Sequence, residues 1–546
     1  MIAADIVAQS LQAHGVTFLS TLVGNGIDPV LHAARAAGLR VIDTHNEQTA
    51  SYMAESYGRL TGRIGVCAVS SSVGFTNALI GAVNAHFDGA PMLLIAGASD
   101  RAYAGRGCFQ DFDQVAAASP IFKNARLVDH PDKIAFHIHE AIAAATSGRP
   151  GPVHLTIPLD VLNSQVSQAP ALSPLLTGSG LVQPACRGSA ALVEQAAASI
   201  AASERPLLVA GSGVFYAHGE DALARFLTQT DMPVMAPIWD RGSVASPLPQ
   251  FMGVIGAASG SPRLLDSADL VILAGARVDY RVGYMQPPEV RSDVRIVRIS
   301  ADAGELHQGV EPSIAIHGDA RSVLEQIALL LPDRPSATQA RWLEEAQQRN
   351  RQFHARWATP LSSSGPMTGR HIVEALRSFV QGDTVFVVDG GNIGQWVHMA
   401  MCDRYPGHWL TCGASGVVGF GMGGGMAAKV AYPQRPAILL SGDGSMGFNI
   451  ADWESATRQN LPFVGIVADD QAWGIVVSGQ TRRYGAADTV AARLGRIRFD
   501  QMAEACGALG MRVEEPRDLA PAIERGLAAA RPCLIHVPIA HGGPAD

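Results

Sequence analysis

The chain has 546 residues, of which 47% are hydrophobic and only 16% are charged, and it contains 57 glycines. At roughly 150 residues per domain, this length predicts three or four domains with a large buried core, and the composition excludes a disordered chain. The 41 basic residues are outnumbered by 49 acidic ones, giving a net charge of −8 without a basic block, so nothing supports binding to nucleic acid or to a membrane surface.

Seven cysteines are scattered along the chain without a C-x-x-C pair, which favours a reduced, cytoplasmic protein over a disulfide-bonded one. Residues 1–15 follow a helical pattern that includes an acid, with neither the basic region nor the cleavage site of a signal peptide. The longest apolar runs, such as 91–98, have the length of a strand and fall far short of a membrane span. We therefore expect a soluble cytoplasmic protein.

Short apolar runs alternate with alanine-rich stretches along the chain, a rhythm that is typical of βαβ units and parallel sheets. In chain order, the expected buried strands are 64–70, 91–97, 152–157, 206–211, 270–276, 295–300, 384–390, 437–443 and 463–469. Residues 163–189 and 332–369 interrupt this rhythm with Ser, Pro and Gly and are expected to be linkers, the second built around a charged helix. The sequence thus predicts three doubly wound α/β domains with parallel sheets, at 1–162, 190–330 and 365–546.

A glycine-rich turn, Ser-Gly-Asp-Gly-Ser-Met-Gly at 441–447, follows one predicted strand, and the next predicted strand ends at Asp469 and Asp470. Such a turn lets backbone N–H groups and a helix N-terminus approach a phosphate, and an acid within it is suited to a divalent cation that bridges to the phosphate. Asp443 and Asp470 are 27 residues apart and would meet at one edge of a parallel sheet. Taken alone, an ordinary tight turn explains the pattern equally well.

The G-D-G turn followed after 27 residues by a polar pair resembles the signature of thiamine diphosphate enzymes. The resemblance implies that Asp443, Asp470 and the backbone carbonyl of Ala472 bind Mg²⁺. The chain departs from the family pattern because Asp469-Asp470 stands where relatives typically have Asn-Asn. A second carboxylate is still a good ligand for Mg²⁺, but it adds negative charge beside a diphosphate.

An independent match comes from residues 41–97, which resemble the pyrimidine-binding domain of acetolactate synthase and benzaldehyde lyase almost continuously. The family's catalytic glutamate falls on Glu47, and the resemblance implies that its carboxylate hydrogen-bonds the far ring nitrogen of the cofactor's aminopyrimidine and so promotes cofactor activation. An isolated Glu after a strand would more simply be a surface residue. The sequence departs from the family pattern at two positions near Glu47: Asn46 replaces the usual His, and Ser-Val-Gly at 72–74 replaces a common Gly-Pro-Gly turn.

The resemblance also implies a set of cofactor-binding residues. The turn after the strand at 384–390 matches the family's diphosphate turn, the Gly416 carbonyl is expected to accept from the cofactor's amino group, and Val418 takes the apolar position that bends the cofactor. The glycines at 419–424 formally match a dinucleotide fingerprint, which we reject because no clear strand precedes them. The implied cofactor-binding residues are Gly390, Gly391, Asn392, Gly416, Val418, Gly442, Gly444, Ser445 and Met446.

The sequence gives fewer indications of the residues that bind the substrate. The loop Gly-Cys-Phe-Gln-Asp around Gln110 resembles the loop in which acetolactate synthases and benzaldehyde lyase place a Gln near the reacting carbon, so Gln110 is a candidate catalytic residue. Asn25 lies where relatives line the same pocket, and Gly26 stands where benzaldehyde lyase has a His, so that acid–base group is missing. Trp473 and Ile475 follow the metal motif and are expected in the substrate pocket.

The middle block contains Gly-Ser-Gly at 211–213 after a strand, and residues 275–283 are similar to the acetolactate synthase segment that helps hold FAD. Some relatives bind FAD in this domain, oxalyl-CoA decarboxylases bind ADP, and others leave it empty. Because a fold does not imply a ligand, FAD, ADP and no ligand all stay open here.

These observations predict a thiamine diphosphate- and Mg²⁺-dependent C–C bond lyase or carboligase acting on 2-keto acids or 2-hydroxy carbonyl compounds, acetolactate-synthase-like in the first instance. The alternative within this group is an enzyme of the benzaldehyde lyase or 2-hydroxyacyl-CoA lyase type. There are two alternatives of another class: a catalytically silent regulatory subunit that binds the cofactor, and a flavin or nicotinamide oxidoreductase. The family joins the first block of one chain to the third block of another, which implies a homodimer or homotetramer with active sites between subunits.

Overall fold

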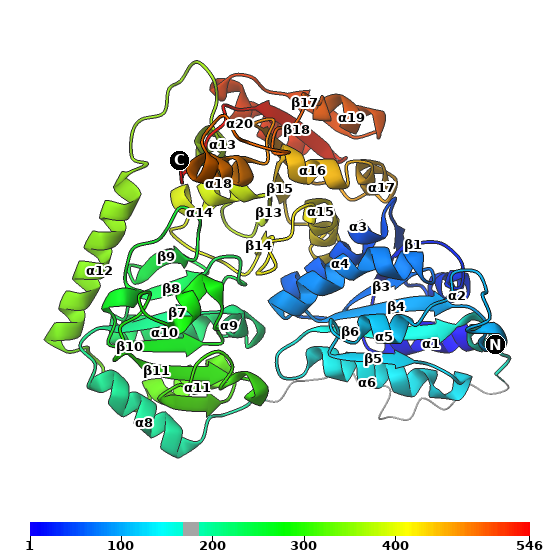
Figure 1. The fold of residues 1–546 in the computed structure, drawn as a ribbon, viewed down its shortest axis with the longest axis horizontal. Helices are drawn as coiled ribbons and strands as arrows, with labels where there is room; N and C mark the ends of the chain where they lie inside the picture. Colours follow the sequence, from blue (N-terminus) through cyan, green and yellow to red (C-terminus); the bar gives the residue numbers. More distant parts are fainter. Residues whose placement is uncertain (167–184) are drawn as a thin grey trace.

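The computed structural model describes residues 1–166 and 185–546 and contains three parallel six-stranded sheets with alternating helices (Figure 1). This arrangement confirms the predicted fold of three doubly wound α/β domains. The first predicted linker, 163–189, falls largely on residues 167–184 and so lies outside the described residues.

The N-terminal domain has the strand order β2-β1-β3-β4-β6-β5. Its strands are β1 (Phe18–Leu22), β2 (Arg40–Asp43), β3 (Gly65–Val69), β4 (Met92–Ala98), β5 (Asn124–Leu127) and β6 (Pro152–Pro158). Its helices are α1 (Ala3–Ala13), α2 (Asp28–Ala36), α3 (Glu47–Thr61), α4 (Val73–Asp88), α5 (Gln114–Ala118), α6 (Ile134–Thr146) and α7 (Leu159–Leu162). The central strands β3 and β4 are buried almost throughout, which explains their continuous apolar sequences.

The central domain has the order β12-β11-β10-β7-β8-β9. Its strands are β7 (Pro206–Ala210), β8 (Val234–Pro237), β9 (Phe251–Ile255), β10 (Leu270–Ala274), β11 (Arg295–Ser300) and β12 (Ile314–His317), and its helices are α8 (Ala190–Ala201), α9 (Ser212–Tyr216), α10 (Glu220–Thr230) and α11 (Ala320–Ala328). The charged helix of the second predicted linker is α12 (Ala337–Ala355), whose Trp342 packs into the core of this domain. Helix α12 therefore connects the central domain to the third one while covering part of the former.

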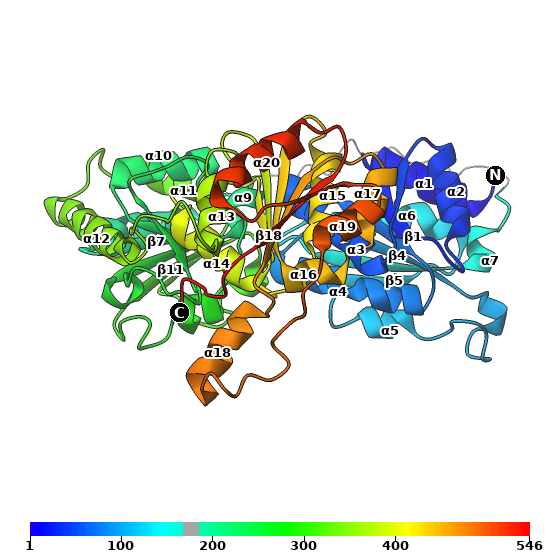
Figure 2. The same ribbon diagram turned by 90° about the horizontal axis from the view of Figure 1, so that it is seen from above.

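The third domain has the order β14-β13-β15-β16-β18-β17. Its strands are β13 (Val385–Asp389), β14 (Trp409–Thr411), β15 (Ala437–Gly442), β16 (Val464–Asp469), β17 (Leu509–Arg512) and β18 (Cys533–Pro538). Its helices are α13 (Gly369–Leu376), α14 (Gly391–Ala400), α15 (Gly421–Ala431), α16 (Asp443–Phe448), α17 (Asp452–Arg458), α18 (Gly474–Tyr484), α19 (Phe499–Ala505) and α20 (Pro516–Ala528). Helix α18 stands out from the body of the molecule (Figure 2).

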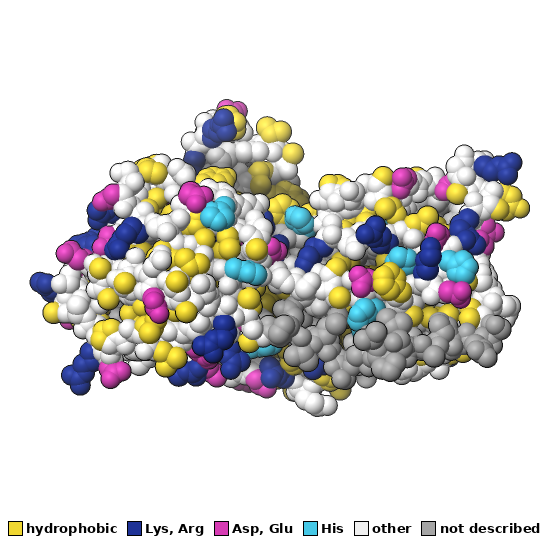
Figure 3. Space-filling model, turned by 90° about the horizontal axis from the view of Figure 1, so that it is seen from below, with side chains coloured by type: hydrophobic (Ala, Val, Ile, Leu, Met, Phe, Trp, Pro, Cys, Tyr) yellow, Lys and Arg dark blue, Asp and Glu magenta, His cyan; other side chains and the backbone are white. Residues whose placement is uncertain are grey.

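The N-terminal and third domains meet along α3 and α15, which lie against each other with little space between them. A Cβ atom at Gly423 of α15 would lie 2.6 Å from Cβ of Tyr52 on α3, so the glycine allows the two helices to approach closely. On the face shown in Figure 3, basic and acidic side chains are interspersed rather than gathered into a patch of one sign. None of the described helices is long and apolar enough to cross a membrane.

Candidate active site

Three adjacent strands of the third sheet end at one edge, and the predicted cofactor residues follow them. Asp389 of β13 pairs with Ser441 of β15, and Gly442 of β15 pairs with Ala468 of β16. A cavity of 310 Å³ opens at this edge. Its lining includes the predicted residues Gly390, Gly391, Asn392, Gly416, Val418, Gly442, Asp443, Gly444, Ser445, Asp470, Ala472, Trp473 and Ile475. Met446 is placed differently, because its side chain is buried and its sulfur accepts a hydrogen bond from Trp453.

The two predicted metal-binding carboxylates face this cavity. Burial and, to a lesser degree, the neighbouring charge of Asp470 raise the pKa of Asp443 to about 7. Burial also raises the pKa of Asp470, while the hydrogen bond from His541 Nδ1 to its Oδ2, at 2.9 Å, works in the opposite direction. Asp443 Oδ2 accepts from the backbone N–H of Ala472 at 3.2 Å, which ties the two motifs together. Two buried carboxylates that repel each other are stabilised by a cation between them.

No three His, Cys, Asp or Glu side chains cluster as a complete metal site within residues 1–166 and 185–546. Two carboxylates and one carbonyl leave the rest of a six-coordinate Mg²⁺ shell for diphosphate oxygens and water, which is how this ion is usually bound beside a phosphate. The two carboxylates and the carbonyl therefore fit a Mg²⁺ ion that is also bound by a diphosphate better than a Mg²⁺ ion bound by the protein alone.

Two histidines pair with Asp469 and Asp470, the two aspartates that stand where relatives typically have Asn-Asn. Asp469 points away from the cavity and forms an ion pair with the fully buried His536, whose Nε2 lies 2.8 Å from Asp469 Oδ2. The other ring nitrogen of His536 lies 3.2 Å from Asp500. His541 pairs in the same way with Asp470. Each of the two carboxylates thus has a histidine partner, and Asp469 is paired within the core rather than beside a diphosphate.

Asn392 supplies a further indication that an anion binds here. Its Nδ2 atom is buried and has no hydrogen-bond partner among the described residues. The surrounding backbone approaches it closely, since a Cβ atom at Gly474 would lie 2.5 Å from Nδ2 and one at Gly543 would lie 2.2 Å from Oδ1. Helix α14 begins at Gly391, so its free backbone N–H groups lie at the same edge. A buried, unused amide donor beside a helix start fits a diphosphate.

The predicted residues of the N-terminal domain form a second cluster. Glu47 is the first residue of α3, and its Oε2 accepts from Asn77 Nδ2 at 2.7 Å. The hydroxyl of Ser71 donates to Gln110 Oε1 at 3.1 Å and accepts from Asn25 Nδ2 at 3.3 Å. Gln110 has a φ of +54°, a strained conformation that is common at functional sites.

Gly26 completes this cluster. A Cβ atom at Gly97 of β4 would lie 2.5 Å from the carbonyl carbon of Gly26, so the Gly26 turn lies in close contact with the end of this strand. None of Glu47, Gln110, Asn25 and Gly26 is among the residues that line the cavity of the third domain in the same chain. Within one chain, the structure therefore separates the predicted site into two halves.

Comparison with known proteins decides the family. The chain matches the N-terminal TPP binding domain of thiamine pyrophosphate enzymes over residues 1–117, their central domain over 193–327 and their C-terminal TPP binding domain over 389–537. The chain belongs to the thiamine pyrophosphate enzyme family. Thiamine pyrophosphate and thiamine diphosphate are two names for the same cofactor.

Relatives of this thiamine pyrophosphate enzyme cover nearly its whole length. A probable acetolactate synthase from Mycobacterium bovis is 27% identical over 98% of this chain and 95% of the relative. 2-Hydroxyacyl-CoA lyase 1 from Mus musculus is 29% identical over 98% of this chain and 94% of the relative. 2-Hydroxyacyl-CoA lyase 2 from Caenorhabditis elegans is 28% identical over 94% of this chain and 84% of the relative. The chain is thus a thiamine pyrophosphate-dependent enzyme of the lyase and carboligase group, as the sequence predicts.

A small crevice lies at the carboxyl ends of the adjacent strands β7 and β10, where the following strands β8 and β11 continue the sheet in opposite directions, which is the usual ligand position of such a sheet. The crevice measures 70 Å³. The backbone N–H of Ser212, which would face a phosphate, donates instead to Asp240 at 2.9 Å. Arg149 and Arg277 line the crevice but form ion pairs with Glu305. In this conformation the polar side chains of the crevice are paired with one another.

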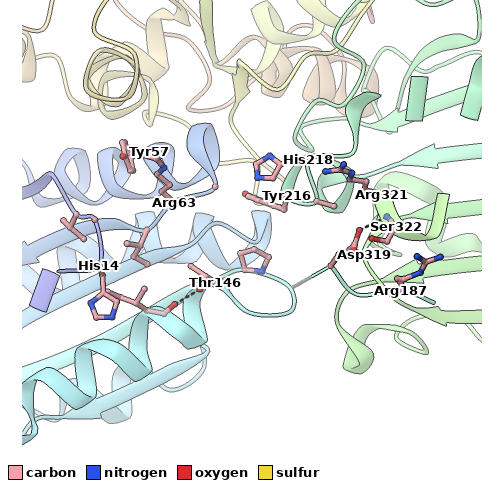
Figure 4. Close-up of a pocket in the computed structure, with 18 of the residues that line it drawn as sticks. His14, Tyr57, Arg63, Thr146, Arg187, Tyr216, His218, Asp319, Arg321 and Ser322 are labelled. Atoms are coloured by element: carbon pink, nitrogen blue, oxygen red, sulfur yellow. Dashed lines mark hydrogen bonds between the residues drawn. The ribbon is translucent and has the colours of Figure 1, made fainter. Parts of the chain in front are cut away.

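A larger cavity, of 1020 Å³, lies between the N-terminal and central domains. Figure 4 shows His14, Tyr57 and Arg63 on one side of it and His218 and Arg321 on the other. The predicted site residues are absent from the described lining of this cavity. The predicted cofactor residues thus line the 310 Å³ cavity of the third domain and not this larger one.

The sequence gives little indication of how three further residues, Asp389, Ser71 and Asn77, support the predicted site. Asp389 stood only as the end of a strand, yet its buried carboxylate accepts from the N–H groups of Gly419 (3.1 Å) and Gly421 (2.9 Å), and burial raises its pKa to about 7. Ser71 and Asn77, which hold Gln110 and Glu47, resemble any polar residue near a helix start. The position of Asp389 at the carboxyl end of a central strand was the one usable signal.

Proposed function

We propose that this protein is an acetolactate-synthase-like carboligase or lyase that uses thiamine diphosphate and Mg²⁺ to make or break a C–C bond in 2-keto acids or 2-hydroxy carbonyl compounds. The observation that carries the proposal is the 310 Å³ cavity, in which the buried carboxylates of Asp443 and Asp470 lie beside the unpartnered amide of Asn392. These groups suit a magnesium-bridged diphosphate.

In this proposal Asp443, Asp470 and the carbonyl of Ala472 bind Mg²⁺. The diphosphate is bound by Asn392 and by the turns that hold Gly390, Gly391, Gly442, Gly444, Ser445 and Met446. Gly416 and Val418 contact the aminopyrimidine end. When bound, the cofactor supplies a nucleophilic carbon that adds to a carbonyl group and then stabilises negative charge. Glu47 holds a hydrogen bond to the aminopyrimidine ring, and Gln110 stabilises the substrate oxygen.

We further propose a homodimer, or a homotetramer built from such dimers, in which the Glu47 cluster of one chain covers the cavity of another. Apolar side chains are exposed on both halves of the divided site. Val23, Val73, Phe109 and Phe112 surround the Glu47 cluster, with Phe109 71% exposed. Val476 lines the cavity, and Phe448 and Tyr484 are exposed on α16 and at the end of α18. Exposed apolar patches of this kind are typical of protein–protein interfaces.

The substrate pocket is then formed by Asn25, Gly26 and Gln110 from one chain and by Trp473 and Ile475 from the other. A 2-hydroxyacyl-CoA lyase activity is the second candidate, because the relatives with that name match as much of the chain as the acetolactate synthases do. Benzaldehyde lyase activity ranks lower, since Gly26 offers no acid–base group. We propose a cytoplasmic location, which the seven free cysteines support.

The experiment is a calorimetric titration with thiamine diphosphate and Mg²⁺, followed by product analysis with pyruvate, benzoin and 2-hydroxyacyl-CoA substrates. We expect binding that requires Mg²⁺, and carbon dioxide or aldehyde release from at least one substrate class. Failure of the wild-type protein to bind the cofactor would refute the proposal. Binding without turnover of any substrate class would favour the silent regulatory subunit. A yellow preparation would show that the central crevice opens to hold flavin.

A further inference from the structure

The loop that carries Gly416 and Val418 rests on a buried polar network. Residues 411–415 lead from the end of β14 into this loop, and four of them contact side chains from other domains. The carbonyl of Thr411 accepts from Arg59 Nη2 at 2.7 Å. The N–H of Ala414 donates to Asp88 Oδ1 at 2.7 Å, and the hydroxyl of Ser415 donates to Asn84 Oδ1 at 2.6 Å.

The network itself is deeply buried. Arg59 and Asn84 are 0% exposed and Asp88 is 3% exposed. Arg59 Nη2 lies 2.6 Å from Asp88 Oδ2, and Asn84 Nδ2 donates to Glu55 Oε1 at 3.0 Å. In a site of low dielectric, such paired groups hold one another and their backbone partners in a fixed geometry.

Gly413 shows how closely the loop fits this network. It has a φ of +88°, and a Cβ atom there would lie 2.5 Å from Asp88 Oδ2 and 2.8 Å from Asn84 Oδ1. From the opposite side, the hydroxyl of Tyr280 in the central domain donates to the carbonyl of Ala414 at 3.0 Å. The N-terminal and central domains thus both hold the three residues that precede Gly416.

We infer that Asn84 and Asp88 are positioning residues that fix the Gly416–Val418 loop for the aminopyrimidine end of the cofactor, an inference that rests on the proposed function. The contacts of this network fall on residues 411–415, directly before the loop, whereas other hydrogen bonds between the two domains, such as those that Asp43 and Thr49 form with side chains of α17, lie elsewhere on the interface. The same interface also contains a hydrogen bond from Tyr432 to the carbonyl of Leu60, which is remote from the loop in sequence and serves as a comparison.

Helix α4 holds residues of both halves of the predicted site. Its early residue Asn77 holds Glu47, and its later residues Asn84 and Asp88 hold the loop of the same chain. In the proposed dimer, Glu47 contacts the cofactor in the cavity of the partner chain, whereas the Gly416–Val418 loop contacts the cofactor in the cavity of its own chain. One rigid helix of 16 residues, about 24 Å long, therefore positions groups in two active sites.

The test uses the full-length protein and four variants. Ser415→Ala removes the hydroxyl that Asn84 accepts from, Ser415→Thr keeps a hydroxyl, Gly413→Ala places a methyl group against Asp88, and Tyr432→Phe removes the comparison hydrogen bond. Binding is measured by calorimetry for thiamine diphosphate with Mg²⁺ and, separately, for inorganic diphosphate with Mg²⁺. The second probe reports only on the diphosphate half of the site, which the network does not contact.

We expect Ser415→Ala to weaken thiamine diphosphate binding at least about fivefold, because the hydroxyl donates to Asn84 and also accepts from the N–H of Val417, and we expect Gly413→Ala to weaken it more. Binding of inorganic diphosphate should be unchanged in both, Ser415→Thr should restore cofactor affinity, and Tyr432→Phe should behave as wild type. Unchanged cofactor affinity in Ser415→Ala and Gly413→Ala, or an equal loss for both probes, would overturn the inference. Failure of the wild-type protein to bind the cofactor would instead refute the proposed function.

Discussion

Glu55 is a buried acid whose ionisation opposes folding, and its replacement by glutamine tests this directly. The side chain lies on α3, where its Oε1 accepts from Asn84 Nδ2 while its Oε2 has no hydrogen-bond partner among the described residues. Burial raises its pKa from 4.5 to about 7, and the nearby Arg59 only partly offsets this effect. The folded protein therefore holds the Glu55 proton more tightly than the unfolded chain does.

The sign and size of the effect follow from this difference. Because the folded-state pKa is the higher one, the free energy of unfolding should fall as the pH rises from about 4.5 to about 7. A shift of this size is worth at most about 3 kcal/mol. Glutamine has no charge to bury and keeps an oxygen for Asn84, so Glu55→Gln should be more stable than the wild type at pH 8 and close to it near pH 5.

The assay is urea denaturation of the cofactor-free protein at several pH values between 5 and 8, with the apparent unfolding midpoint compared between variant and wild type. Glu140→Gln, on the exposed face of α6, is the matched control and should follow the wild type at every pH. If the midpoints of Glu55→Gln and wild type differ by the same amount at all pH values, the argument that burial raises the pKa of Glu55 is wrong.

Three further predictions address the site and the assembly. Asp443→Asn should weaken Mg²⁺-dependent cofactor binding at least about tenfold by calorimetry, since it removes one of two anionic ligands, and unchanged affinity would exclude Asp443 as a ligand. Asp389→Ala leaves the N–H groups of Gly419 and Gly421 unpaired and should lower the free energy of unfolding by about 2–5 kcal/mol in urea titrations; a loss below about 0.5 kcal/mol would show that these hydrogen bonds matter little. Phe109→Glu should shift the sedimentation profile towards the monomer, and an unchanged profile would place the interface elsewhere.

The nine expected strands all lie inside the sheets, whereas the short interior strands β1 and β8 were not predicted. The runs at 91–97, 270–276 and 437–443 correspond to β4, β10 and β15, whose continuous apolar sequences reflect their position inside the sheets. Edge strands such as β2 and β17 were not expected, because they are four residues long and partly exposed and therefore carry no apolar run. The sheet order itself depends on long-range pairing that no local pattern encodes.

The site was predictable where sequence neighbours become spatial neighbours. Asp443 and Asp470 follow adjacent parallel strands, so a single βαβ unit brings them together. The histidines that compensate Asp469 and Asp470 were not predictable, because His536 and His541 come from the end of the chain, 67 and 71 residues away. The polar network beneath the Gly416 loop is still less local, since it joins residues more than 300 positions apart.

In the proposed function Glu47 activates bound thiamine diphosphate, and proton exchange at the reactive thiazolium carbon measures this activation without any assumption about the substrate. The exchange rate of that proton with D₂O would be followed by NMR in the wild type and in Glu47→Gln, each loaded with cofactor and Mg²⁺. We predict that the variant still binds the cofactor but exchanges the proton at least about a hundredfold more slowly, within the range that positioned acid–base groups contribute. Equal exchange rates in the two proteins would contradict the account.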